Sequence, residues 1–208
     1  MDFLLKGLLI GVSIAAPVGP IGLLCIQRTV LQGRASGFVS GLGAATADAM
    51  YGSIAGFGID LVSNFLIDQR IWIHLIGGAL LLLLGIKGAL FAKPAEHAAR
   101  TTGHARGIWW SYLSTFLLTI TNPMTILSFV AVFAALGVGN SPHAYVSATL
   151  TVIGVFLGSA LWWLILSGIA GWLRGKLNRT ALLWIGRLSA VIIVGFGIFG
   201  IVSSGAIG

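Results

Sequence analysis

The chain has 208 residues, of which 57% are hydrophobic and only 8% are charged, and its formal net charge is +7. Soluble domains are about 25% charged, so this chain has too few polar side chains to cover a surface that faces water. We therefore expect lipid to be the solvent for most of its surface. The positive charge does not indicate a nucleic-acid partner, because the basic residues stand at the ends of apolar segments,.

Six apolar stretches are long enough to cross a bilayer, which takes about 20 residues in a helix. They run over Phe3–Ile26, Ser36–Ile59, Ile71–Phe91, Trp109–Leu136, Tyr145–Leu173 and Ala181–Val202. Together they use most of the chain and predict an all-α integral membrane protein. We expect the first stretch to be retained as a span, because its apolar run is too long for a signal-peptide core.

The basic residues are distributed unevenly over the connections between these stretches. Ten of the 12 Lys and Arg residues flank connections one, three and five: Arg28, Arg34, Lys87, Lys93, Arg100, Arg106, Arg174, Lys176, Arg179 and Arg187. Because Lys and Arg accumulate on the cytoplasmic side, we expect these three loops in the cytoplasm and both termini outside. The longest connection, residues 92–108, is the basic cytoplasmic loop in this topology.

The parts before and after this loop, residues 1–91 and 109–208, resemble each other. Three pairs recur in the same order: Pro17 and Pro123, Gly52-Ser53 and Gly158-Ser159, and Trp72 and Trp184, each Trp standing 13 residues before a Gly-Ile-X-Gly motif. Because each part has three spans, the second part crosses the membrane in the opposite direction. The sequence therefore predicts two inverted three-helix repeats, an arrangement common in secondary transporters.

The first span is interrupted near its middle by Pro17, Gly19 and Pro20. Each proline removes a backbone donor and clashes with the preceding turn, and freed backbone is tolerated in a bilayer only inside protein or beside a wet cavity. A half-helix that starts at Pro20 would direct its N-terminal amides and partial positive charge into the break. A substrate carboxylate suits such an end, so we predict that these three residues bind substrate.

The fourth span has a matching break at Asn122, Pro123 and Thr125, which adds an amide and a hydroxyl. We expect the two breaks to meet near the middle of the membrane, across the axis that relates the repeats, and to share the substrate. The alternative is that the prolines only kink their helices.

Asp48 is the only acidic residue deep within a predicted span. An ionised carboxylate there costs about 2.5–3.5 kcal/mol even on lenient insertion scales. We therefore predict that Asp48 faces the bundle interior and carries a coupling proton, or pairs with a substrate amine. The alternative is a structural polar contact to Thr46 or Tyr51.

The remaining reactive side chains do not indicate an enzyme, a metal site or a cofactor. Cys25 is the single cysteine, so a disulfide oxidoreductase working within one chain is excluded. The four histidines are scattered without metal-ligand spacing,, and no Ser–His–acid set supports a hydrolase. The glycine ladder Gly33, Gly37 and Gly41 indicates close helix packing within the chain, and a homodimer contact is the alternative.

In combination, these residues resemble the LysE/RhtB-type amino acid exporters over the whole chain. The marks are Pro17-Val18-Gly19-Pro20, the stretch from Gly33 to Gly41 that leads to Ala47-Asp48, Gly85-Ile86-Lys87, and Asn122-Pro123. Two departures stand out. Ala47 occupies a place where the family often has Gly, and Met124-Thr125 follows Asn-Pro where many members have Lys.

The resemblance implies a transporter of the bacterial inner membrane that exports an L-amino acid or a related small metabolite, driven by the proton motive force. It also implies that Asp48 and the two proline breaks form the central site. A metal-ion exporter of the same shape is the alternative. The sequence argues against a metal-ion exporter, because no cluster of acids or histidines accompanies Asp48. Such a cluster would be needed to replace the hydration shell of a metal ion.

Overall fold

The computed structural model of the chain describes residues 2–17, 19–57, 69–90, 104–122, 125, 128–129 and 144–206. The regular elements of these ranges are seven helices, and the ranges contain no strand, as the composition predicts. The helices are α1 (Asp2–Ala15), α2 (Pro20–Gln32), α3 (Arg34–Gly56), α5 (Arg70–Leu90), α6 (His104–Ile120), α8 (Ala144–Arg174) and α9 (Arg179–Ala206).

The first predicted span is two helices, as its prolines and glycines predict. Helix α1 ends at Ala15 and α2 begins at Pro20, and the two axes are bent by 81°. Proline suits the start of α2 because its missing N–H would have no partner there and its φ is already helical. Helix α2 continues to Gln32, past the predicted end at Ile26. Three of the polar residues that lower its hydropathy, Gln27, Arg28 and Thr29, are buried rather than exposed.

Helix α2 turns into α3 at one residue, Gly33. Its φ of +109° lies in a region where the backbone of a residue with a Cβ is strained. It is the one positive φ among the described residues. A glycine tolerates this backbone, which permits the reversal without a longer loop.

Two helices are apolar and long enough to cross a membrane alone, Tyr145–Arg174 and Thr180–Phe199, and the bent pair α1 and α2 makes a third candidate span. Helix α3 is less hydrophobic because its buried face consists mainly of Gly, Ala and Ser, which contact other helices rather than lipid,. The count of six spans stays a prediction.

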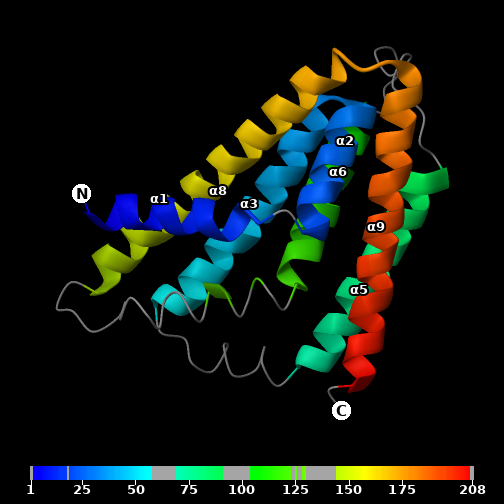
Figure 1. The fold of residues 1–208 in the computed structure, drawn as a ribbon. Helices are drawn as coiled ribbons and strands as arrows, with labels where there is room; N and C mark the ends of the chain where they lie inside the picture. Colours follow the sequence, from blue (N-terminus) through cyan, green and yellow to red (C-terminus); the bar gives the residue numbers. More distant parts are fainter. Residues whose placement is uncertain are drawn as a thin grey trace.

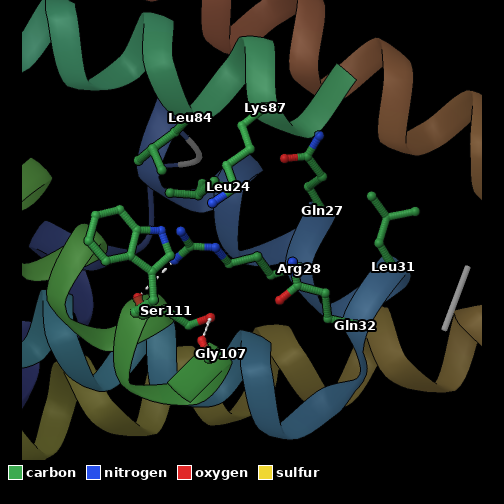
Figure 2. A pocket seen from close by; sticks show the side chains of 10 residues that line it. Leu24, Gln27, Arg28, Leu31, Gln32, Leu84, Lys87, Gly107 and Ser111 are labelled. Carbon is green, nitrogen blue, oxygen red and sulfur yellow. Dashed lines mark hydrogen bonds between the residues drawn. The ribbon is translucent and has the colours of Figure 1, made fainter. Parts of the chain in front are cut away.

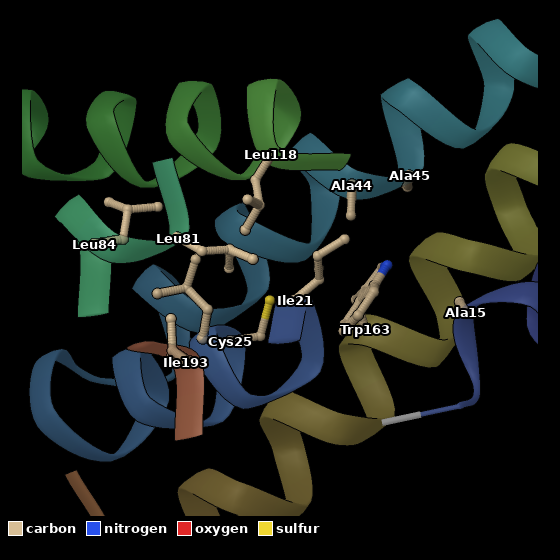
Figure 3. Packing of buried hydrophobic residues seen from close by; sticks show 11 residues of the cluster. Ala15, Ile21, Cys25, Ala44, Ala45, Leu81, Leu84, Leu118, Trp163 and Ile193 are labelled. Carbon is tan, nitrogen blue, oxygen red and sulfur yellow. The ribbon is translucent and has the colours of Figure 1, made fainter. Parts of the chain in front are cut away.

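Helix α3 lies in the centre of the bundle. It packs against α2, α6 and α8, while α1 packs on α8, and α5 and α9 run side by side (Figure 1). One apolar cluster receives a side chain from all seven helices and forms the core (Figure 3): Ala15, Ile21, Leu24, Cys25, Ala44, Ala45, Leu81, Leu84, Leu118, Trp163 and Ile193.

The contact between α5 and α9 is symmetric. A Cβ placed at Gly78 would lie 2.9 Å from the carbonyl oxygen of Gly197, and one at Gly85 would lie 3.2 Å from that of Ala190. At the spacing from Trp72 to Trp184, Gly78 corresponds to Ala190 and Gly85 corresponds to Gly197. Replacing each residue by its counterpart therefore converts either contact into the other. This exchange is what an inverted repeat requires.

The repeat and its limits, residues 1–91 and 109–208, nevertheless stay predictions. One boundary changes: α6 begins at His104, so residues 104–108 belong to this helix rather than to the predicted loop 92–108.

Candidate functional site

The two predicted breaks line one cavity of about 470 Å³, which we call the central cavity. Pro17, Gly19 and Pro20 line it from the break between α1 and α2, and Asn122 and Thr125 line it from the end of α6 and the residues beyond. Pro123, the sixth predicted site residue, lies outside the described residues. The structure thus brings the breaks together, and their binding of a substrate stays a prediction.

The first turn of α2 faces this cavity. Gly19 is its N-cap, with extended backbone and no capping hydrogen bond from a side chain. A Cβ added at Gly19 would meet no atom within 4 Å, so the space beside the cap is open. The first amides of a helix have no partner within the helix and carry its partial positive charge. This end can therefore accept an anionic group.

The rest of the central cavity is mainly apolar, with Ile14, Leu81, Phe196 and Phe199 among its walls. Its described lining contains no Asp, Glu, Lys or Arg, and His74 is its one titratable side chain. A mostly apolar cavity with a few polar groups is typical of small-molecule sites, which occupy about 300–1,000 Å³.

Asp48 does not line this cavity and is buried, with 4% of its surface exposed. Ser159 Oγ of α8 donates to Asp48 Oδ2 at 2.6 Å, and Trp163 Nε1 donates to Ser159 Oγ at 3.1 Å. The prediction that Asp48 faces the bundle interior is confirmed.

The alternative of a structural polar contact for Asp48 stays open, but the hydrogen bond comes from Ser159 rather than from Thr46 or Tyr51. The Thr46 hydroxyl donates to the carbonyl of Leu42, and the Tyr51 hydroxyl donates to that of Ile120.

Trp163 links Asp48 to the central cavity through packing. Its side chain, 5% exposed, belongs to the same apolar cluster as Ile21 and Leu118 (Figure 3). Both of these residues also line the central cavity. A change at the Asp48–Ser159 pair can therefore reach the cavity wall through one aromatic side chain.

Arg28 is a buried polar residue that the sequence analysis used only as a marker of topology. It is 5% exposed, and its guanidinium donates to four oxygens from α3 and α6. These are Ser40 Oγ at 2.9 Å, the Ser111 carbonyl at 2.8 Å, Thr115 Oγ1 at 2.8 Å and Ser114 Oγ at 2.7 Å. The signal in the sequence was the hydroxyl stripe at positions 111, 114 and 115, which lies on one face of a helix.

The profile of the LysE type translocator family matches residues 12–204. The chain belongs to this family. It is therefore a helical membrane protein and a translocator, as the resemblance implied.

Two relatives are similar over much of this LysE-type chain. The Bacillus subtilis (strain 168) protein named "Putative amino acid efflux protein YcgF" is 25% identical over 203 residues, which cover 96% of this chain and 95% of the relative. The Escherichia coli (strain K12) protein named "Uncharacterized membrane protein YahN" is 24% identical over 143 residues, or 68% of this chain and 63% of the relative. No solved structure matches the chain significantly.

Proposed function

We propose that this translocator exports a small zwitterionic solute, with an L-amino acid favoured, across the bacterial inner membrane by proton antiport. The observation that carries the proposal is the central cavity, where the N-terminal end of α2 and the Asn122 break face the same space. The Bacillus subtilis relative is named "Putative amino acid efflux protein YcgF", and this name supports the substrate class. The partners are then the solute and the lipid bilayer, and the predicted topology puts loops one, three and five in the cytoplasm.

In this proposal the solute carboxylate binds at the first turn of α2, where amides without helical partners and the helix dipole favour negative charge. Asn122 and Thr125 orient the amino group from the opposite wall. The apolar walls formed by Ile14, Leu81 and Phe196 suit an uncharged side chain. The described lining contains no carboxylate to balance a cationic side chain.

Asp48 carries the coupling proton. A buried carboxylate within a membrane protein is a functional residue by default. Two hydrogen bonds connect Asp48 through Ser159 to Trp163, which shares an apolar cluster with residues that line the cavity. When the acid gains or loses a proton, its bond with Ser159 changes, and Trp163 and the residues packed on it respond. The two halves then rock around the central cavity and expose it to either side in turn.

A metal-ion exporter is the alternative from the sequence. Among the described residues no group of three His, Cys, Asp or Glu could hold a metal ion, so no specific observation favours it.

Export from dipeptide-loaded cells tests the proposal. Cells that express the protein and cells that lack it are loaded with dipeptides, and a panel of free amino acids is followed inside and outside. The Asp48→Asn variant should lose gradient-driven export while retaining exchange of one amino acid for another, because the binding cavity stays intact. Ser53→Ala is the matched control, since this hydroxyl is partly buried on the same helix and bonds only to the carbonyl of Ala49.

Faster loss of one amino acid in the wild type, and its abolition in Asp48→Asn, supports both the substrate class and the coupling role. Full gradient-driven export by the inserted variant would refute the role of Asp48. If no amino acid leaves faster although the protein is inserted, the substrate class is wrong, and metal-ion tolerance is the next assay.

A further inference from the structure

A second cavity of about 290 Å³, which we call the basic cavity, lies between α2, α5 and α6. Two cationic side chains line it, Arg28 from α2 and Lys87 from α5 (Figure 2). Trp110 and Ser111 of α6 also line it. None of these residues was assigned a binding role from the sequence.

The positive charges of this cavity have no carboxylate partner among the described residues. All four acceptors of Arg28 are neutral hydroxyl or carbonyl oxygens. Lys87 Nζ lies 5.7 Å from the ring centroid of Trp110, a cation–π contact that also leaves the charge uncompensated,. Arg28 is buried, and a buried cation is costly unless an anion balances it,. Lys87 is exposed, and paired cations around a pore or cavity select anions. The cavity is thus suited to an oxyanion.

The basic cavity is in line with the central cavity along the same helices. On α2, Ile21 lines the central cavity and Leu24, one turn later, lines the basic cavity. On α5, Leu81 and Leu84 are related in the same way. All four side chains belong to the same apolar cluster, and we call them the apolar layer because each helix passes from one cavity to the other at these residues.

The C-terminal ends of α2 and α5 indicate which cavity lies nearer to the predicted cytoplasmic side. Connections one and three, which carry the basic residues, follow α2 and α5. The basic cavity therefore lies on the predicted cytoplasmic side of the apolar layer. A solute that leaves the cell would meet it first.

We propose that the basic cavity is a second solute site, which binds the carboxylate of the outgoing solute through Arg28 and Lys87 before the solute crosses the apolar layer. This proposal rests on the proposed function. The solute then passes from one positively charged site to another, from the two cations to the N-terminal end of α2. A lipid phosphate is an oxyanion of the same chemistry. The solute is the favoured source because Arg28 is enclosed within the bundle and lies in line with the central cavity.

The Lys87→Gln variant tests the site in proteoliposomes that contain the full chain and present the cytoplasmic side to the solute. The concentration of amino acid that gives half-maximal export should rise about threefold to tenfold, since one charge-assisted contact is lost. The maximal rate should not change. Lys176→Gln is the matched control, because Lys176 also stands over a tryptophan, with Nζ 3.7 Å from the Trp172 ring centroid, and lines neither cavity.

The methyl ester of the same amino acid tests the contribution of the carboxylate, because esterification removes its negative charge and leaves the rest of the solute unchanged. Wild type and Lys87→Gln should export the ester with equal half-maximal concentrations. Equal values for the free amino acid would overturn the second site while the proposed function stands. An effect of Lys87→Gln that requires anionic lipid, and is absent in vesicles of phosphatidylcholine alone, would assign the cavity to a lipid phosphate and overturn it too.

A binding measurement that does not depend on transport distinguishes failure of the second-site proposal from failure of the proposed function. Sodium acetate, compared with sodium chloride at equal ionic strength, should raise the melting temperature of the purified wild type more than that of Lys87→Gln. If no amino acid is exported and this difference appears, the oxyanion site stands and the proposed function is wrong. If acetate stabilises both proteins equally, the site is overturned.

Discussion

Ser159 donates a hydrogen bond of 2.6 Å to Asp48, although the two residues are 111 positions apart in the chain. The bond joins α3 of the first half to α8 of the second, and neither side chain is exposed by more than 4%. A single hydroxyl from the second predicted half thus holds the one acid that lies deep in the bundle among the described residues. In the proposed rocking of the halves, this bond joins the two parts that move.

The Ser159→Ala variant should therefore slow proton-driven export at least tenfold. It leaves Asp48 without this donor, and an unsatisfied buried polar group costs about 1–3 kcal/mol. Export rate and melting temperature are measured together. Ser167→Ala is the control, because Ser167 is buried on the same helix but bonds only to carbonyls of that helix, Trp163 and Leu164. An unchanged rate in Ser159→Ala would show that the bond does not contribute to coupling.

Arg28→Lys should destabilise the protein although it keeps the positive charge. A lysine ammonium cannot reproduce the planar fork that reaches oxygens on both α3 and α6,. We expect a loss of roughly 1–3 kcal/mol in the free energy of unfolding, seen as a lower melting temperature. Arg187→Lys, an exposed arginine of α9, should melt like the wild type. Equal melting of the two variants would mean that the charge alone matters at Arg28.

Thr125→Val should weaken solute binding in the central cavity without affecting folding. The two side chains have nearly the same shape, so the change removes a hydroxyl from the cavity wall and leaves its volume unchanged. We expect the half-maximal concentration for export to rise about threefold to tenfold, as for the loss of one hydrogen bond. Thr149→Val, whose exposed hydroxyl bonds to the Tyr145 carbonyl, is the control. A rise of the same size in the control would contradict the assignment.

Gly33→Ala should lower the melting temperature. A backbone φ of +109° is strained for any residue with a Cβ, and such strain costs about 1–3 kcal/mol. Gly168→Ala provides the comparison, because a Cβ there meets no atom within 4 Å and alanine favours the helix by up to about 1 kcal/mol. If both variants melt alike, the turn at Gly33 has relaxed and α2 and α3 can join in another way.

Much of the site could be predicted because broken helices leave strong local signals. Proline and glycine act on the backbone of their own turn, so the break between Ala15 and Pro20 was evident from the sequence. Asp48 was evident because a charge within an apolar run is rare. We expected the two breaks to meet because the predicted repeat gives them equivalent positions in the two parts of the chain.

Arg28, Ser159 and the basic cavity could not be predicted in the same way. Serine and threonine are common on transmembrane helices and usually bond to their own backbone, as Ser53 and Thr149 do,. Whether such a hydroxyl also receives a partner depends on which helix packs opposite. Arg28 resembled the basic residues that end a span, and only its surroundings distinguish it.

The sequence by itself determined that this protein is helical, that it lies in lipid, and where its helices break. The effects of composition, hydropathy and proline are local or depend on the solvent, so they can be predicted without the packing of the helices. The tertiary structure decided which polar groups meet: Asp48 with Ser159, Arg28 with the hydroxyls of α6, and Arg28 with Lys87 across one cavity. These pairs depend on the position and rotation of helices far apart in the chain, and those are set only when the whole bundle packs.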